Sequence, residues 1–287
     1  MNKTNLKDFL SLNFSIIIIS TSAILVRYIP LAPTIIAFER AIIAVISIGI
    51  FILFSKNSFQ INGFKDKLLL TVSSIFFSLH WISYFYSLKL SSVALGMLSL
   101  YTFPIITSLI EPIYFKTKFN NRHLALALIV IAGLYTMSPS INLEDSDTKG
   151  IAYGITSGFC FSIRNLMLKK NTKNYKSSVL MFYQLAFSAI FFLPFVFKEN
   201  IIASFEFAYL LLFFGIITTA LGHTIFLNSL KRFNISSASI IASSQPVFGI
   251  ILAFVVLNEI PSMRTVFGGF LILSTVFIES YFSSKDS

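Results

Sequence analysis

Four charged side chains are the clearest charges within stretches of the sequence that are otherwise apolar. Glu39 and Arg40 are neighbours in one such stretch, whereas Glu111 and Arg164 lie in two others. A charged side chain costs at least about 2.5 kcal/mol near the centre of a bilayer, so such residues are candidates for function. Arg40 can bind a substrate carboxylate, or it can be a structural residue bonded to backbone carbonyls. Glu111 and Arg164 have opposite charges at similar depth, which predicts either a gating pair or, for Arg164, an ordinary cytoplasmic anchor.

Polar and aromatic side chains recur at helical spacing in another apolar stretch. His80, Tyr84 and Ser87 are four and three residues apart, which places them on one face of a helix. Such a face can hydrogen-bond a polar solute, and Trp81 can stack on a flat or cationic one. Alternatively, Trp81 and Tyr84 belong to an interfacial aromatic belt, and the serines allow close helix packing. The other candidates for substrate binding are Tyr101, Asn165, Gln184, His223, Asn228 and Gln245.

Two prolines fall near the middle of long apolar stretches. Pro104 and Pro246 each remove a helical N–H donor and expose carbonyl groups, which is tolerated where helices line a cavity. We therefore expect both helices to bend at these points and the two prolines to take part in gating.

Motifs for metal or nucleotide chemistry are absent from the sequence. It contains no His-Glu-x-x-His motif, no Cys-x-x-Cys pair and no phosphate-binding glycine loop ending in Lys-Ser or Lys-Thr. We therefore expect no metal, no cofactor and no enzymatic activity.

The composition requires these residues to be carried by membrane helices. The chain has 287 residues, of which 55% are hydrophobic and 12% charged, with a mean hydropathy of +0.81. Soluble domains carry about a quarter of their residues as charged side chains, so a soluble or disordered protein is excluded. Crossing a bilayer takes roughly 20 apolar residues in a helix. The apolar runs are Phe9–Ile29, Ile35–Phe54, Leu68–Tyr86, Val93–Phe115, His123–Pro139, Gly150–Leu168, Val179–Phe197, Phe207–Leu227, Ile235–Leu257 and Val266–Phe282.

The distribution of basic residues orients these ten runs. With the N-terminus inside, 15 of the 22 Lys and Arg residues fall in inner loops and termini, which is the arrangement that the positive-inside rule favours. The net charge of +10 is thus a signal of topology, and we expect no nucleic acid partner. Both termini are predicted to lie in the cytoplasm. The protein itself is predicted to lie in the inner (cytoplasmic) membrane of the cell.

The two halves of the chain resemble each other at an offset of 142 residues. This offset aligns Ser87 with Ser229, Pro104 with Pro246 and Arg122 with Arg264. Because each half has an odd number of runs, the second half must insert upside down. Inverted repeats of this kind place a site near the midplane that opens alternately to either side.

The sequence resembles the EamA-type transporters of the drug/metabolite transporter superfamily from about Phe9 to Tyr281. The resemblance implies a solute pathway lined mainly by the first, third, fourth, sixth, eighth and ninth helices. The first half departs from the common pattern at Lys116-Thr117, where many relatives carry Gly-Glu, so no role is carried onto Thr117. The matching segments are Phe38-Glu39-Arg40, Tyr101-Thr102-Phe103-Pro104, Ala220-Leu221-Gly222-His223-Thr224, Ser229-Leu230-Lys231, Ser243-Ser244-Gln245-Pro246-Val247 and Asn258-Glu259.

The sequence therefore predicts an all-α polytopic membrane protein with ten transmembrane helices in two inverted five-helix repeats, residues 1–141 and 150–287. Its expected function is secondary active transport of a small metabolite by alternating access. The substrate class favoured is an amino acid or related amphipathic solute, and export is the favoured direction. Expected partners are this solute, the lipid bilayer and, as a candidate coupling ion, the proton, in a monomer or homodimer. The alternatives are an integral-membrane enzyme and a non-transporting membrane protein.

Overall fold

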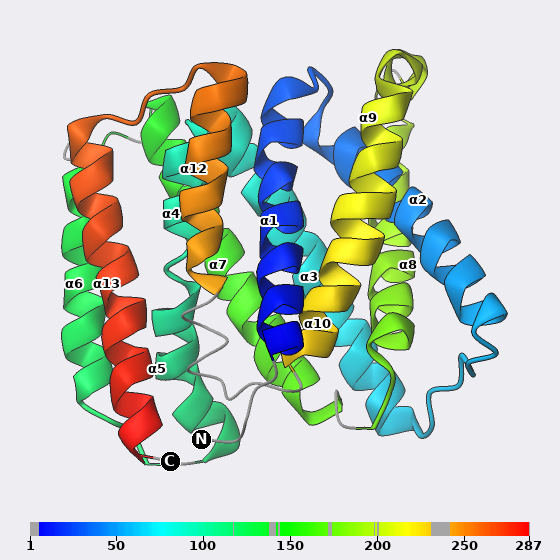
Figure 1. Cartoon of the computed structure of the whole chain (residues 1–287), viewed down its shortest axis with the longest axis horizontal. Helices are drawn as coiled ribbons and strands as arrows, with labels where there is room; N and C mark the ends of the chain where they lie inside the picture. The colour runs from blue at the N-terminus through cyan, green and yellow to red at the C-terminus, as the bar shows by residue number, and fades with distance from the viewer. Residues whose placement is uncertain are drawn as a thin grey trace.

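The chain folds into a bundle of helices, seen in a computed structural model that describes residues 6–116, 118–137, 142, 144–171, 174–197, 199, 201–230 and 242–286. No strand occurs among these residues. Helices α6 and α13 pack together at one edge of the bundle and α2 and α8 at the other (Figure 1). The elements are α1 (Leu6–Tyr28), α2 (Pro33–Phe54), α3 (Phe64–Leu90), α4 (Val93–Leu100), α5 (Phe103–Phe115), α6 (Arg122–Met137), α7 (Ser146–Asn171), α8 (Ser177–Val196), η1 (Ile201–Phe207), α9 (Ala208–Phe213), η2 (Phe214–His223), α10 (Thr224–Leu230), α12 (Ser244–Leu257) and α13 (Met263–Asp286).

Helical structure is found in every predicted apolar run, so the predicted all-α class is confirmed. The short run that begins near His123 forms α6, and only the second part of the ninth run, α12, lies within the described residues. Within the described residues, six helical segments are long and apolar enough to cross a bilayer. Several large apolar side chains also point away from the bundle; Leu128 is 68% exposed and Phe270 is 70% exposed. Exposed apolar surface on this scale is typical of a protein that meets lipid.

The fourth predicted helix is interrupted near mid-length. The fourth run divides into α4 and α5, which are separated by Tyr101 and Thr102, and Pro104 occupies the first turn of α5. Proline is tolerated there because the first turn of a helix needs no N–H donor. The prediction that the fourth helix bends near Pro104 is thus confirmed. Pro246 lies in the first turn of α12, and residues 231–241 before it lie outside the described part of the chain.

The eighth run contains a π-helix, which the sequence did not predict. Helix α9 passes into η2, a π-helix of ten residues, before α10 resumes the α-helical winding. The Thr219 hydroxyl donates to the carbonyl oxygen of Phe214, five residues earlier, at 2.8 Å. π-Helical turns are rare and are frequently found at functional sites. This winding sets the directions of Thr219 and His223, which both belong to the site described below.

Small residues bring α7 close to α3 and α4. Gly150, Gly154 and Gly158 are spaced by one helical turn, and a Cβ atom on Gly154 would lie 2.5 Å from the Cβ atom of Ser99. The Ser87 hydroxyl donates to the carbonyl oxygen of Gly150 at 2.6 Å. Ser87 therefore takes part in helix packing, which is the alternative that the sequence left open. This close packing fixes the position of α3, which supplies three residues of the site.

Candidate functional site

A cavity of about 50 Å³ lies within the bundle, between elements from both halves of the chain. It receives side chains from α1, α2, α3, α4, α5, α7, η2, α10 and α12. Seven of the ten predicted binding residues meet here, and the lining helices include all six that the family resemblance implied. The lining residues are Ile19, Ser22, Arg40, His80, Trp81, Tyr84, Leu100, Tyr101, Phe103, Phe161, His223, Phe226, Ala242 and Gln245.

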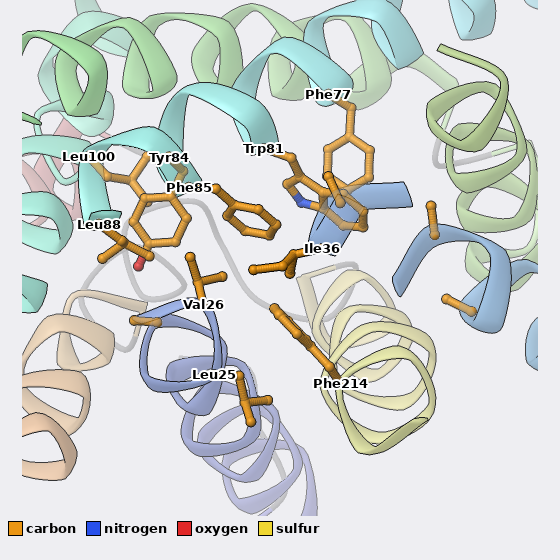
Figure 2. Packing of buried hydrophobic residues seen from close by; sticks show 14 of the residues in the cluster. Leu25, Val26, Ile36, Phe77, Trp81, Tyr84, Phe85, Leu88, Leu100 and Phe214 are labelled. Carbon is orange, nitrogen blue, oxygen red and sulfur yellow. The ribbon is translucent and has the colours of Figure 1, made fainter. Parts of the chain in front are cut away.

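Arg40 is the most deeply buried charge of this cavity, with 2% of its surface exposed. Its Nε donates to the hydroxyl oxygen of Thr219 at 2.9 Å. The centre of its guanidinium lies 3.8 Å from the ring centroid of Trp81 and 4.1 Å from that of Phe214. Figure 2 shows Trp81 and Phe214 reaching the core from different helices. Cation–π contacts of this kind hold a guanidinium in a fixed orientation.

No carboxylate pairs with Arg40 among the described residues. The adjacent Glu39 carboxylate instead accepts a hydrogen bond from the Ser204 hydroxyl at 3.3 Å. The Nη2 atom of Arg40 is buried and has no hydrogen-bond partner. A buried guanidinium nitrogen without a partner is unusual, because buried polar groups are nearly always bonded.

His80 is held by a reciprocal pair of bonds with Ser157 on α7. The Ser157 hydroxyl donates to the His80 carbonyl oxygen at 2.9 Å, and the same hydroxyl oxygen lies 2.7 Å from His80 Nδ1. Since the hydroxyl has one proton, this geometry assigns a hydrogen to Nδ1. The Nε2 atom of a neutral imidazole is then the acceptor. The ring lies 4.6 Å from that of Phe161, between centroids, in the cavity wall.

Tyr101 joins the two halves of the chain across the cavity. Its hydroxyl lies 2.5 Å from the carbonyl oxygen of Ala242 and 3.0 Å from Oε1 of Gln245, and can donate to either. The Ser20 hydroxyl lies 3.2 Å from the backbone carbonyl oxygen of Gln245. By contrast, the hydroxyl of Tyr84 is buried and has no partner. The break before Pro104 positions Tyr101, because the residue caps the C-terminus of α4.

Arg164 belongs to a second polar cluster beside the cavity. Its guanidinium donates to Oε1 of Gln184, at 3.2 Å from Nε and 2.5 Å from Nη2, and to Oδ1 of Asn165 at 2.9 Å. Gln184 in turn donates to the Ser73 hydroxyl at 3.3 Å. Neutral amide oxygens thus accept from this guanidinium, and its pairing with Glu111 to close the cytoplasmic side stays a prediction.

The three remaining predicted binding residues lie outside the cavity wall. Asn165 and Gln184 belong to the Arg164 cluster, and Asn228 on α10 is exposed. This second cluster still approaches the cavity through an aromatic ring, since the Arg164 guanidinium lies 4.7 Å from the centroid of Phe77. Phe77 contacts Trp81, with 4.7 Å between ring centroids.

A polar network that the sequence did not predict joins the helix ends on the side predicted to be outer. Arg27 Nε donates to Oε1 of Glu259 at 2.9 Å, and Oε2 of Glu259 accepts the backbone N–H of Val93 at 2.9 Å. Arg27 also donates to the carbonyl oxygens of Leu88 and Lys89. These contacts connect the ends of α1 and α3 and the start of α4 with the residue pair that follows α12. Arg27 lies near the end of the first apolar run and Glu259 just after the ninth, so both fall on the predicted outer side, which is the signal that could have paired them.

Comparisons with known proteins agree with this architecture. The model of the EamA-like transporter family matches residues 9–138 and 148–281. Two relatives from Archaeoglobus fulgidus, both described as uncharacterized transporters, are 27% identical over 217 residues and 26% identical over 218 residues. The first match covers 75% of this chain and 77% of the relative, and the second 75% and 76%.

A solved structure supports the fold independently of these sequences. A crystal structure titled only as that of a protein superposes with a TM-score of 0.70 at 16% identity. The superposition covers 98% of this chain and 99% of the other, which shows a shared fold. With the family model matching both halves, the chain belongs to the EamA-like transporter family and is a multi-pass membrane protein.

Proposed function

We propose that this protein is a secondary active transporter that moves a small metabolite across the cytoplasmic membrane by alternating access. The solute class is an amino acid or a related amphipathic molecule, and export is the favoured direction. The observation that carries this proposal is the cavity between the two halves of the chain, with polar donors on aromatic walls. Family membership gives the general activity, transport, and the cavity provides a place for a solute.

We propose that alternating access in this chain uses ten crossings arranged as two inverted five-helix units. Support comes from the family match, which divides into two segments of similar length, and from the position of the helix breaks. The α4–α5 break and the π-helix η2 both contribute side chains to the cavity wall. Broken helices at a midplane site are typical of transporters built from inverted repeats.

The orientation proposed from the basic residues places both termini in the cytoplasm. In the bundle, α1 begins and α13 ends toward the same side, the lower one in Figure 1. The Arg27–Glu259 network then lies at the outer side, where it keeps the helix ends together. The structure thus fits an arrangement in which the cavity is closed from outside.

Solute counterflow into proteoliposomes tests this proposal. Vesicles containing the purified protein are loaded with unlabelled leucine and diluted into trace radiolabelled leucine, and the same is done for a set of other amino acids and organic acids. A transporter gives transient, saturable accumulation of label, and protein-free vesicles provide the control. Accumulation of no solute above that control would favour the alternatives, a membrane enzyme or a non-transporting membrane protein.

The same vesicles test the proton as a coupling ion. His80 and His223 line the cavity, and each can bind a proton when the site is open to water. If protons are coupled to the solute, an imposed pH gradient drives net uptake of a solute that shows counterflow. Uptake that is insensitive to the gradient would indicate a facilitative carrier, in which solute movement is not coupled to protons.

A further inference from the structure

The region around the cavity holds two buried positive charges without a carboxylate partner. Arg40 and Arg164 are 2% and 5% exposed, and both pack against aromatic rings. Their hydrogen-bond acceptors within the described chain are a hydroxyl and amide oxygens, which are neutral, and a thioether sulfur. Buried charges are normally paired with opposite charges. The interior therefore carries an excess of positive charge that an anionic ligand can neutralise.

Two unused donors meet in the same cavity. Arg40 Nη2 and the Tyr84 hydroxyl are both buried without a hydrogen-bond partner among the described residues, and both residues line the cavity wall. Tyr84 comes from α3 one turn beyond Trp81, on whose ring the Arg40 guanidinium lies. Figure 2 shows Tyr84 and Trp81 projecting from this helix into the same packed region. A ligand that supplies acceptors to both donors would satisfy two groups that the protein leaves unbonded.

The number and type of donors favour a carboxylate over a phosphate or sulfate. Arg40 already uses Nε on Thr219 and stacks one face on Trp81, which leaves an edge of the guanidinium for a ligand oxygen. One oxygen of a carboxylate can accept from Arg40 and the other from Tyr84. The bond with Arg40 joins two charged groups, and such hydrogen bonds are stronger than those between neutral groups. The remaining wall, which includes Leu100, Phe103 and Phe161, suits an apolar group.

Among the described residues, the cavity wall also lacks an anionic group that would pair with an ammonium. No Asp or Glu lines it, and Oε1 of Gln245 lies within hydrogen-bond distance of the Tyr101 hydroxyl. A zwitterionic amino acid would bring a second charge to a wall that offers only neutral acceptors. A carboxylate without an ammonium compensates the charge of Arg40 and adds no further positive charge to the interior.

We infer that the site selects small organic monoanions, with the carboxylate held between Arg40 and Tyr84 and an apolar group against the aromatic wall. This inference rests on the proposed transport function and, within its solute class, favours related amphipathic molecules that carry a carboxylate but no ammonium over amino acids themselves. It predicts that charge, rather than shape, ranks ligands of one carbon skeleton. The anion binds best, the zwitterion and the neutral amide bind less well, and the amine binds least.

Binding to the purified full-length protein in detergent tests the inference directly. Trp81 is the only tryptophan of the chain, and its ring faces the Arg40 guanidinium, so its emission reports on this site alone. The probes are isocaproate, isocaproamide, leucine and isohexylamine, which share a branched apolar group and differ in charge. Binding is followed by Trp81 emission and by ligand-dependent thermal stabilisation. Isocaproate is expected to bind more tightly than isocaproamide by a factor of about ten or greater, because a hydrogen bond to a charged group is worth about 1.5–3 kcal/mol.

Two variants assign the preference to the named donors. Tyr84→Phe removes a hydroxyl that bonds nothing in the structure, so the fold should be unaffected, and isocaproate should bind about tenfold more weakly. Arg40→Gln should abolish the difference between isocaproate and isocaproamide. Tyr135→Phe, on the exposed face of α6, is the matched control and should change neither affinity.

The outcomes separate this inference from the proposed function. Equal affinity for isocaproate and isocaproamide overturns the inference. Unchanged isocaproate affinity in Tyr84→Phe also overturns it. The same holds if isocaproate changes neither Trp81 emission nor thermal stability. If a neutral or cationic solute then shows counterflow, the transport function stands while the anion preference falls. If isocaproate binds as expected but no solute shows counterflow, the binding site stands and the transport function falls.

Discussion

Arg40 shows how a single charge can be held inside a helix bundle without an acidic partner. Two aromatic rings cover its faces and one threonine hydroxyl accepts from Nε. The threonine is in position because the π-helical winding of η2 turns it toward α2. The hydroxyl therefore has two roles, since it accepts from Arg40 and donates to the carbonyl oxygen of Phe214.

Replacing Thr219 with valine should destabilise the protein although the side chain keeps its shape. The substitution leaves Arg40 Nε buried without an acceptor, at a cost of about 1–3 kcal/mol, so the thermal midpoint in detergent should fall. Thr156→Val is the matched control because Thr156 also bonds a carbonyl of its own helix, but on an exposed face. Equal midpoints for the two variants would show that the contact with Arg40 contributes nothing.

The sequence predicted the residues that line the cavity, Arg40 among them, better than it predicted their hydrogen-bond partners. A charge within an apolar run is conspicuous, and so is the helical spacing of His80 and Tyr84. Thr219 and Ser157 have no such signal, because hydroxyl residues are common in membrane helices and most bond their own helix. The Glu111–Arg164 gating pair stays a prediction, because similar depth does not specify which helix faces which, and Arg164 bonds amide oxygens in this arrangement.

At the scale of helices, the glycines of α7 determine how close this helix lies to α3 and α4. The spacing of Gly150, Gly154 and Gly158 produces a smooth face, and the α4–α5 break packs on it. A Cβ atom on Gly158 would lie 2.9 Å from the carbonyl oxygen of Leu100, just before the break. The proline predicted the break, whereas no comparable residue predicted the π-helix of η2.

Gly154→Leu should therefore separate α7 from α4 and destabilise the bundle. Even a Cβ atom would lie 2.5 Å from that of Ser99, which is closer than real contacts allow, and a leucine must displace the helix. Overpacking of this kind typically costs about 1–3 kcal/mol, so the thermal midpoint in detergent should fall measurably. Ala152→Leu adds a similar side chain on the exposed face of the same helix and should leave the midpoint nearly unchanged. A tolerated leucine at position 154 would argue against the close α7–α4 contact.

For the whole molecule, the sequence predicted the class of fold and the helices that meet at the cavity, because membrane helices follow from long apolar runs. The interactions between the halves were less predictable. Tyr101 with Gln245 and Arg27 with Glu259 join residues more than a hundred positions apart, and no local pattern specifies such pairs. These cross-half contacts are the ones that must rearrange if the halves rock against each other.

The Arg27–Glu259 network should limit access to the cavity from the outer side. Glu259 contacts both the Arg27 guanidinium and the N–H of Val93, and so connects the end of α12 with α1 and α4. Glu259→Gln keeps the shape but removes the charge. A partly exposed ion pair is worth up to about 1 kcal/mol, so its loss should raise the outward-open population by roughly fivefold at most.

The substitution Ser22→Cys, at a residue that lines the cavity, reports this opening in a Cys160→Ala background. A membrane-impermeant maleimide added outside should label that cysteine several-fold faster in Glu259→Gln. Glu144→Gln, which neutralises an exposed acid of another predicted outer loop, should leave the rate unchanged. Equal labelling rates with Glu259 and with Glu259→Gln would mean that the network packs helix ends together without gating the cavity.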